Sequence, residues 1–302
     1  MSPAPAVSVV VPAYRSDATV GRFLDGLRRQ TFGDFELILV NSTPADGTAA
    51  AVERLFPEAT YAESAVRLLP HEARNRGLEF ARGDLLAFTD PDCRPHPDWL
   101  ELLVAAHGRG NRAVAGAMSV AGEAAWFERG VHMCKFWWAL PGRRPGAAWI
   151  APSANASYER GLWDEIGPFP GGFSGDAVLS WRATAAGSPP WFEPRAIVEH
   201  RHPGGLRELW DERLLRGREF GNERALHERW TRTRLATAAA AAPMLPPLVL
   251  ARAARESGRV GWGRTFVSTL PVQLAGHAAW SLGETAGFVS LLRRGSAAGR
   301  VD

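Results

Sequence analysis

The sequence predicts an α/β fold: a doubly wound, mainly parallel sheet flanked by helices. Apolar runs of strand length alternate with stretches of helical periodicity from residue 7 to residue 120, a pattern typical of parallel sheets. The chain has 302 residues, 46% hydrophobic and 22% charged, which is enough to bury a sizeable core. Ligands of such sheets bind beyond the carboxyl ends of the strands. The loops expected there are Pro12–Asp17, Asn41–Thr48 and Asp90–Pro97.

Each expected strand is a short apolar run bounded by turn residues. Val7–Val11 is rich in β-branched residues and ends at Pro12, which predicts a buried strand. Further strands are expected at Phe35–Val40, Ala65–Leu69 (the weakest), Leu85–Thr89 and Ala113–Val120.

The helices expected between these strands carry apolar residues at helical spacing and begin at capping residues. Ser16 or Asp17 is expected to cap the first helix, and Asp98 to cap the last of this half. The apolar positions are Val20, Phe23, Leu24 and Leu27 in the first helix, Val52, Leu55 and Phe56 in Ala49–Phe56, and Leu102, Leu103 and Ala106 after Asp98; a further helix, His71–Ala81, is closed by Gly83.

Several functional classes are excluded by composition and by missing motifs. Two cysteines, Cys93 and Cys134, are too few for a disulfide framework or a cysteine-built zinc site, and the opening residues do not resemble a signal peptide. A cytoplasmic location is therefore expected. The first strand is not followed by Gly-x-Gly-x-x-Gly, and the single lysine, Lys135, rules out a phosphate loop. No basic cluster interleaved with aromatic residues predicts a nucleic-acid partner.

Two carboxylates, Asp90 and Asp92, stand at the end of the fourth apolar strand. If the strand continues through Pro91, both side chains point the same way, because side chains alternate along a strand. Paired carboxylate oxygens suit Mg²⁺ or Mn²⁺, ions usually completed by phosphate oxygens and water. The alternative is an ordinary Asp-Pro-Asp loop without metal.

Nine segments stand out by their order and spacing along the chain. They are Val7–Tyr14, Glu36–Val40, Asp46–Thr48, Ala73–Gly77, Asp90–Asp92, Asn155–Arg160, Ile166–Phe169, Gly175–Arg182 and Val198–His200. Together they resemble the family 2 glycosyltransferases over residues 6–230. The resemblance implies the GT-A fold, with a nucleotide-sugar-binding half (residues 1–120), an acceptor-side half (121–230) and a helical, apolar and basic C-terminal extension (231–302).

The resemblance also implies roles for individual residues. Asp92 matches the acid that binds the divalent cation, with Asp90 near the ribose and His200 near the metal or diphosphate. Asp176 matches the general base that deprotonates the acceptor hydroxyl in inverting members. Pro12, Ala13, Tyr14, Asn41 and Arg74 match positions that line the nucleotide pocket. Alternatives remain open for three of them: a helix N-cap for Asp176, strand-end polarity for His200, and helix surface for Arg74.

The residue types fit sugar transfer from a nucleotide diphosphosugar, a UDP-sugar being the first choice, to a glycan or lipid-linked acceptor. A cation offsets the charge of the leaving diphosphate, and a carboxylate takes the proton of the acceptor hydroxyl. This predicts an inverting, metal-dependent enzyme of cell-surface polysaccharide or glycolipid synthesis. The rivals are a sugar-1-phosphate nucleotidylyltransferase, which would need a Gly-rich basic loop that is missing, and a degenerate sugar-nucleotide-binding or scaffold protein.

The degenerate alternative rests on departures from the family pattern. Asn41 and Ser42 stand where many relatives carry two acids after the second strand, and Gly175 stands where relatives often place a glutamate before the base.

Aromatic residues between positions 121 and 150 predict an acceptor-side loop, with plain core as the alternative. They are Trp126, Phe127, Phe136, Trp137, Trp138 and Trp149.

The C-terminal part differs in composition from the rest of the chain. Leu206–Trp230 is expected to form an amphipathic helix over the sheet, and the uncharged segments Leu235–Ala251 and Thr265–Gly283 follow. Residues 231–302 hold nine arginines and three acidic residues, while the whole chain has a net charge of +3. A polar stripe made by Gln273, His277, Ser281 and Glu284 favours an interfacial helix, or one packed on a partner, over a membrane span.

The arginines flanking the two uncharged segments predict peripheral attachment to an anionic membrane, at the inner face of the cell membrane. They are Arg252, Arg255, Arg259, Arg264, Arg293 and Arg294. The alternatives are a helical lid on the catalytic domain and, last, a true membrane span.

Overall fold

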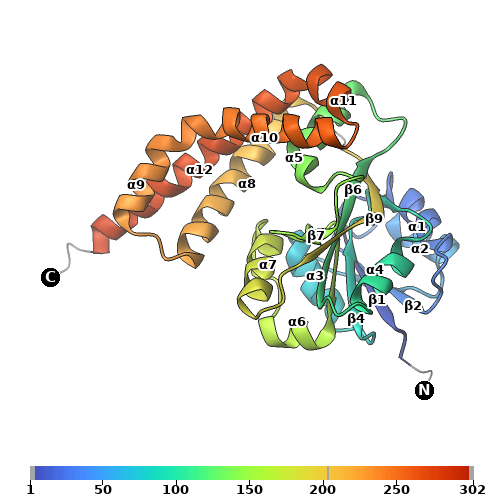
Figure 1. The fold of residues 1–302 in the computed structure, drawn as a ribbon. Helices are drawn as coiled ribbons and strands as arrows, with labels where there is room; N and C mark the ends of the chain where they lie inside the picture. The colour runs from blue at the N-terminus through green and yellow to red at the C-terminus, as the bar shows by residue number, and fades with distance from the viewer. Residues whose placement is uncertain (1–3, 203, 299–302) are drawn as a thin grey trace. The chain divides into compact units, whose positions relative to one another are not determined.

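A computed structural model describes residues 4–202 and 204–298, with side chains through Arg293. The chain divides into two units, each described here by itself. Unit 1 is formed by residues 1–121 and 139–201, and unit 2 by residues 122–138 and 202–302 (Figure 1). The expected division at residue 230 therefore differs from the observed one, because residues 122–138 and 202–230 cluster with the C-terminal helices.

Unit 1 is built on a mixed sheet with strand order β3-β2-β1-β4-β8-β6-β9-β5, and β7 pairs with β9. Strands β1, β2, β3 and β4 pair in parallel, as do β6 and β9. Strand β8 runs antiparallel to β4 and β6, and β5 runs antiparallel to β9. The strand bounds are β1 Val7–Ala13, β2 Phe35–Asn41, β3 Thr60–Glu63, β4 Leu85–Thr89, β5 Cys93–Pro95, β6 Ala113–Val120, β7 Gly146–Ala147, β8 Asn155–Glu159 and β9 Trp191–His200.

Helices cover both faces of this sheet, with α1, α2 and α4 on one side and α3, α6 and α7 on the other (Figure 1). Their bounds are α1 Val20–Arg28, α2 Thr48–Leu55, α3 Pro70–Leu78, α4 Trp99–His107, α6 Arg160–Ile166 and α7 Gly175–Ala185. The apolar positions that predicted α1 are all fully buried. The predicted α/β class and mainly parallel sheet are thereby confirmed.

The third strand is the element that the sequence placed wrongly. It spans Thr60–Glu63, pairing with Ile38–Asn41 of β2, whereas Ala65–Leu69 lies in the loop before α3. Val66 in that loop is 67% exposed. Strand β3 is an edge strand of polar, half-buried residues, so the nearby apolar run gave a stronger but misleading signal.

The expected helix caps also differ in detail. Thr19 is the N-cap of α1 and makes no side-chain capping bond; instead, the backbone carbonyl of Ser16 accepts hydrogen bonds from the Thr19 and Val20 amides. Asp98 is the N-cap of α4, as expected, but its side chain makes no capping bond. Helix α3 ends at Leu78, before the expected Ala81.

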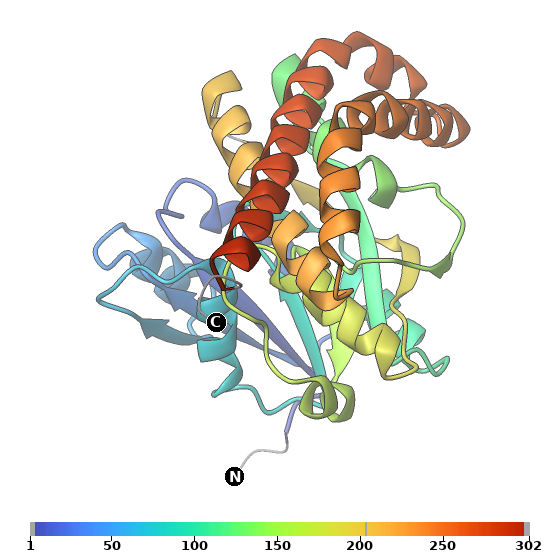
Figure 2. The ribbon, with the colours of Figure 1, turned by 90° about the vertical axis from the view of Figure 1, so that its left-hand side faces the viewer.

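Unit 2 consists of helices, and its long helices α8 and α12 pack along one another (Figure 2). Val131 of α5, Leu209 of α8 and Val272 of α12 form one of its apolar clusters, which is why segments far apart in sequence belong to one unit. Helix α8, expected over the sheet, instead packs on α12 within unit 2. Leu209 and Phe220 are buried there, while Leu206 and Leu214 are 55% and 37% exposed. The bounds are α5 Trp126–Phe136, α8 Leu206–His227, α9 Arg232–Ala241, α10 Leu245–Arg259, α11 Gly263–Ser268 and α12 Leu270–Ala298, with short 3₁₀ turns η1 (Trp137–Ala139) and η2 (Ala242–Met244).

The polar stripe of α12 lies inside unit 2 and not on its surface. Gln273, His277, Ser281 and Glu284 are each no more than 6% exposed. Among the described residues, one helical stretch, Arg232–Arg259, has the length and composition needed to cross a membrane. Of its apolar 18-residue segment, 17% is buried. Length and composition alone are weak grounds for a span.

Candidate functional site

The loops after β1 and β2 lie side by side, as the parallel sheet predicts. The Ser42 amide donates to the Ala13 carbonyl (2.9 Å), the Arg15 amide to Thr43 Oγ1 (3.1 Å), and the Ser16 amide to Asp46 Oδ2 (3.0 Å). Because these bonds join the two loops directly, the carboxyl ends of β1 and β2 form one continuous edge above the sheet.

The three residues expected to line a nucleotide pocket close β1 at this edge. Pro12 and Ala13 are buried and pair with Val40 and Asn41 of β2, while Tyr14 is half-buried. The guanidinium of Arg67 stacks over the Tyr14 ring at 4.5 Å, a contact that the sequence did not predict. Arg67 comes from the loop before α3, which the sequence had assigned to a strand.

Asn41 is fully buried and holds the β2 loop together. Its amide nitrogen lies 3.0 Å from the Thr43 carbonyl, 3.1 Å from Asp46 Oδ1 and 3.0 Å from the Tyr61 hydroxyl. Its oxygen accepts from the Thr43 amide at 3.0 Å. These bonds occupy the amide group within the loop, and the side chain is fully buried, so the expected role of Asn41 in nucleotide binding stays a prediction.

Asp46 is a charged group that joins these two loops. Burial alone would raise its pKa, but hydrogen bonds from Thr48, Ser16 and Asn41 outweigh that effect and hold the pKa of Asp46 below its usual value. The loop edge therefore keeps a carboxylate near neutral pH although the two aspartates or glutamates of many relatives are absent.

The two acids after β4 converge with a histidine at the end of β9. Ligand atoms of Asp90, Asp92, Cys93 and His200 all lie within 4.8 Å of one another. The expectation of a strand continuing through Pro91 was wrong: β4 ends at Thr89, and a turn brings the carboxylates together before β5 begins at Cys93. Backbone bonds from Cys93 to the Asp90 carbonyl (3.0 Å) and from Arg201 to the Asp92 carbonyl (3.1 Å) hold this turn.

The donors of this cluster fit a small divalent cation. His200 Nε2 lies 3.8 Å from Asp92 Oδ1, and both side chains are largely buried, at 10% and 29% exposure. Burial and the neighbouring Asp92 and Asp90 charges raise the pKa of the Cys93 thiol well above its usual value. A thiol is also a soft ligand, which suits Zn²⁺ better than Mn²⁺ or Mg²⁺. Two carboxylates and one imidazole then remain, a set suited to Mn²⁺ or Mg²⁺.

Arg74 lies in the same place and is one of the largest fully buried side chains, at 1% exposure. It forms an ion pair with Asp90 and donates to the Ser153 carbonyl at 3.3 Å. The alternative that Arg74 covers the surface of its helix is therefore wrong. Helix α3 uses this side chain to add a fixed positive charge beside the acidic turn.

Asp176 occupies the first turn of α7, two residues after the N-cap, Ser174. Its Oδ1 accepts from the Ala177 amide at 2.8 Å, and its carbonyl accepts from Ser180 Oγ at 2.7 Å. Ser180 Oγ in turn accepts from the Ala151 amide at 2.9 Å. The N-cap alternative is thus not what the structure shows. Asp176 is not among the residues of the metal-ligand cluster, so its role as base stays a prediction.

Gly175, just before Asp176, lies against the imidazole of His71. A Cβ built on Gly175 would come within 2.7 Å of the His71 ring, which is buried and stacked on Phe169 with ring centres 4.6 Å apart. The space of a side chain at position 175 is thus filled by a residue of α3, one turn before Arg74. The sequence gave no local signal for this contact.

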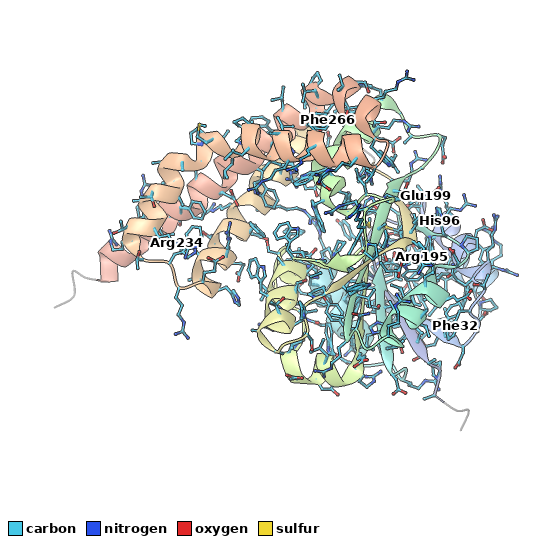
Figure 3. All side chains as sticks on the ribbon, viewed as in Figure 1. Phe32, His96, Arg195, Glu199, Arg234 and Phe266 are labelled. Carbon is cyan, nitrogen blue, oxygen red and sulfur yellow. The ribbon has the colours of Figure 1, made fainter. Side chains whose placement is uncertain are left out.

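Glu199 and His96 form a polar group that the sequence did not predict (Figure 3). Glu199 and His200 are consecutive in β9, so their side chains point to opposite sides of the strand. Arg22 Nη2 lies 2.9 Å from Glu199 Oε2, and His96 Nε2 lies 3.8 Å from Glu199 Oε1. The ion pair of Arg22 and Glu199 joins α1 to β9, the strand that carries His200.

The aromatic stretch of residues 121–150 is shared between the two units. Trp149 of unit 1 is 55% exposed, while Trp137 and Trp138 of unit 2 are half-buried. Trp126, 51% exposed, donates from its indole to the Ser268 carbonyl of the same unit. Only Trp149 therefore combines high exposure with a place in the unit that carries the acidic cluster, and its role toward an acceptor stays a prediction.

Comparison with known proteins identifies the family. A family model described as glycosyl transferase family 2 matches residues 8–160. The chain is similar to glycosyltransferase AglE of Haloferax volcanii, at 29% identity over 61% of this chain and 62% of AglE. It is also similar to the Escherichia coli WfgD, named a UDP-Glc:alpha-D-GlcNAc-diphosphoundecaprenol beta-1,3-glucosyltransferase, at 28% identity over 28% of this chain and 34% of WfgD. The chain thus spans less than two thirds of either relative.

A solved structure shows the same fold. It is the mannosyltransferase PcManGT from Pyrobaculum calidifontis in complex with GDP-Man and Mn²⁺, which matches with a TM-score of 0.55 and 21% identity over 91% of this chain and 88% of that one. At this identity the likeness establishes the fold.

Proposed function

The chain belongs to glycosyl transferase family 2, and from this premise we propose that it transfers a sugar from a nucleotide diphosphosugar to an acceptor hydroxyl with inversion of configuration. The observation that carries the proposal is the convergence of Asp90, Asp92 and His200 beside Arg74 at the carboxyl end of the sheet. Donors and acceptors named for relatives point to a nucleotide-sugar and a polyprenyl-diphosphate-linked or other glycan acceptor.

The nucleotide end of the donor is assigned to the joined loops after β1 and β2. Tyr14 offers an aromatic face that Arg67 already stacks on, and Arg15 follows it with an exposed side chain. A base or ribose stacked on Tyr14 would place the diphosphate toward the acidic turn, because both lie at the carboxyl ends of adjacent parallel strands, β1 and β4.

The diphosphate is assigned to the cluster of Asp90, Asp92 and His200. A divalent cation held there supplies positive charge that offsets the growing negative charge of the leaving nucleoside diphosphate. Arg74 orients Asp90 through their ion pair, and it adds a fixed positive charge beside the place where the cation would bind. His200, at the end of β9, is the third ligand of this cluster.

The acceptor hydroxyl is assigned to Asp176. A hydroxyl is a weak nucleophile near neutral pH, so a carboxylate within hydrogen-bond reach takes its proton as the new bond to the anomeric carbon forms. The Ala177 amide bond holds Oδ1, which leaves Asp176 oriented by its own helix. In a single displacement, the acceptor oxygen attacks the anomeric carbon from the face opposite the leaving diphosphate, which inverts the configuration at that carbon.

The test is isothermal titration of UDP, GDP and dTDP into the full chain with Mn²⁺, repeated with EDTA. We expect one nucleotide to bind only with the metal. Asp92→Asn should abolish the metal-dependent binding of that nucleotide. Asp164→Asn, at an exposed aspartate, should leave this binding unchanged. Binding of none of the three by folded protein would overturn the proposal in favour of a degenerate scaffold.

A second measurement separates an enzyme from a binding protein. Asp176→Asn should keep the nucleotide affinity of the parent and lose transfer from the matching nucleotide-sugar, because it removes the proton acceptor without altering the acidic turn. Equal transfer by Asp176→Asn and the parent would show that another group is the base.

A further inference from the structure

Helix α10 of unit 2 exposes one continuous face with two halves of different chemistry. Its first half presents Met244, at the junction with η2, and Leu248, which are 60% and 53% exposed. Its second half presents Arg252 and Arg255, both exposed. These positions follow one another at spacings of three and four residues, so they lie on the same side of the helix.

The opposite side of α10 anchors the helix within its unit. Leu250, Ala253 and Ser257 are each buried to 9% exposure or less and also recur at spacings of three and four. Since the buried side is satisfied by unit 2, the face of Met244, Leu248, Arg252 and Arg255 remains on the surface of the unit.

The charge around this face is mainly positive. All seven arginines between residues 232 and 293 are exposed: Arg232, Arg234, Arg252, Arg255, Arg259, Arg264 and Arg293. Two of these arginines pair with acids, Arg234 with Glu228 at 2.6 Å and Arg259 with Glu256 at 2.8 Å, and Glu284 is only 6% exposed. Arg252 and Arg255 of the α10 face stand outside these two ion pairs.

We propose that this face of α10 binds the surface of an anionic lipid bilayer, with Met244 and Leu248 reaching the acyl-chain boundary and Arg252 and Arg255 contacting lipid phosphates. An amphipathic helix that lies in the interface needs an apolar patch for insertion and arginines for anionic headgroups. Arginine stems lie along the apolar region while their guanidinium groups reach the phosphates.

The helix lies on the membrane and does not cross it. Pro243 lies in η2, which separates α9 from α10, and Pro246 and Pro247 lie in the first turn of α10. Arg252 and Arg255 then follow within the same stretch, where a span would have to bury them in hydrocarbon. The prolines and the two arginines therefore argue against Arg232–Arg259 as a membrane-spanning helix.

The experiment is co-sedimentation of the full chain with vesicles of phosphatidylcholine alone and of phosphatidylcholine with 30% phosphatidylglycerol, at low and high salt. We expect binding to the anionic vesicles and release at high salt, because the attraction is screened within about 10 Å at 0.1 M salt. Arg252→Gln/Arg255→Gln should weaken partitioning at least roughly tenfold, since each basic residue near the surface contributes about one factor of five.

Matched variants make the result specific to this face. Arg28→Gln/Arg54→Gln, at exposed arginines of unit 1, should bind like the parent, while Leu248→Ser should weaken binding without altering the charge. Circular dichroism of each variant checks that it is folded.

Three outcomes would overturn the proposal. They are absence of binding to anionic vesicles, equal binding to neutral and anionic vesicles that salt does not reverse, and equal losses in the α10 and unit 1 double variants. The second outcome would indicate a membrane span, and the third a non-specific charge effect.

Discussion

At the scale of single residues, the space beside Asp176 is shaped by a glycine and a histidine that are distant in sequence. The His71 ring fills the volume that a side chain at position 175 would take. The departure from relatives at Gly175 is therefore a packing requirement of this chain, and it does not by itself indicate lost activity. The acidic cluster of Asp90, Asp92 and His200 does not include position 175.

This packing predicts the cost of adding one methyl group. Gly175→Ala should lower the free energy of unfolding by about 1–3 kcal/mol, because its Cβ would overlap the His71 ring in a buried, stacked site. The double variant with His71→Ala should recover part of that loss, giving a favourable coupling in a double-mutant cycle measured by urea unfolding.

The control for this cycle is Gly171→Ala, where no atom lies within 4 Å of the added Cβ. It should change stability by no more than a few tenths of a kcal/mol. Purely additive losses for Gly175→Ala and His71→Ala would contradict the steric explanation.

At the scale of elements, α8 and α12 approach each other closely because glycines line their contact. A Cβ on Gly217 of α8 would overlap the Trp280 carbonyl, and a Cβ on Gly283 of α12 would overlap the Leu214 carbonyl. Backbone atoms cannot rotate away as side chains do, so the two helices would have to separate.

Two alanine substitutions at helical glycines should therefore have opposite effects. Gly283→Ala should destabilise the chain by at least about 1–3 kcal/mol through overpacking against backbone. Gly258→Ala of α10, where nothing lies within 4 Å, should stabilise it by about 0.5–1 kcal/mol because alanine has the better helix propensity. Thermal and urea unfolding measure both, and a shared sign would refute this account of the helix contact.

The buried stripe of α12 makes stability depend on pH. Burial raises the pKa of Glu284 from 4.5 to about 7, so the folded chain binds a proton that the unfolded chain has lost between these values. This contribution is fully present below pH 4.5 and is lost as the pH rises through 7. Burial, with Arg213 nearby, lowers the pKa of His277 from 6.5 to about 3, which acts in the opposite direction as the pH falls.

Glu284→Gln isolates the first effect, because His277 is common to both proteins. Relative to the parent, the variant should gain stability as the pH rises from 5 to 8, by up to about 3 kcal/mol. Urea unfolding at several pH values measures the difference. Parallel curves for parent and variant would show that Glu284 titrates normally in the folded chain.

At the scale of the whole molecule, the chain passes between its two units at residues 121–122, 138–139 and 201–202. The family resemblance ends near residue 230, but α5 and α8 lie before that point and pack with α12. A boundary drawn from the family resemblance alone would cut through a packed set of helices.

Truncation should expose this difference. A chain ended after Trp230 would leave Val131 and Leu209 without Val272, so we expect dye-binding apolar surface and rapid proteolysis within α5 and α8. A chain ended after Arg293 keeps these contacts and should resist proteolysis like the parent. Equal protection of α8 in both would mean that unit 2 does not depend on its C-terminal helices.

Much of the fold and part of the site could be read from local patterns. Strands β1, β2, β4 and β6 and the helices between them follow from apolar periodicity, which reports burial within one segment. Asp90 and Asp92 could be proposed as ligands because they follow a buried strand. The partners His71, Ser153 and Arg67 could not, since each comes from a loop or helix whose own pattern carries no sign of its neighbour.

The sequence by itself determined the α/β class and the edge of the sheet where the polar loops meet, because side-chain periodicity and chain order decide these. The family followed from the resemblance of its motifs to those of known glycosyltransferases. Tertiary structure alone decided that a turn joins the two carboxylates to His200, that Arg74 is buried against Asp90, and that the α12 stripe faces inward. The physical reason is that such contacts depend on how distant segments share volume and charge, which local periodicity does not record.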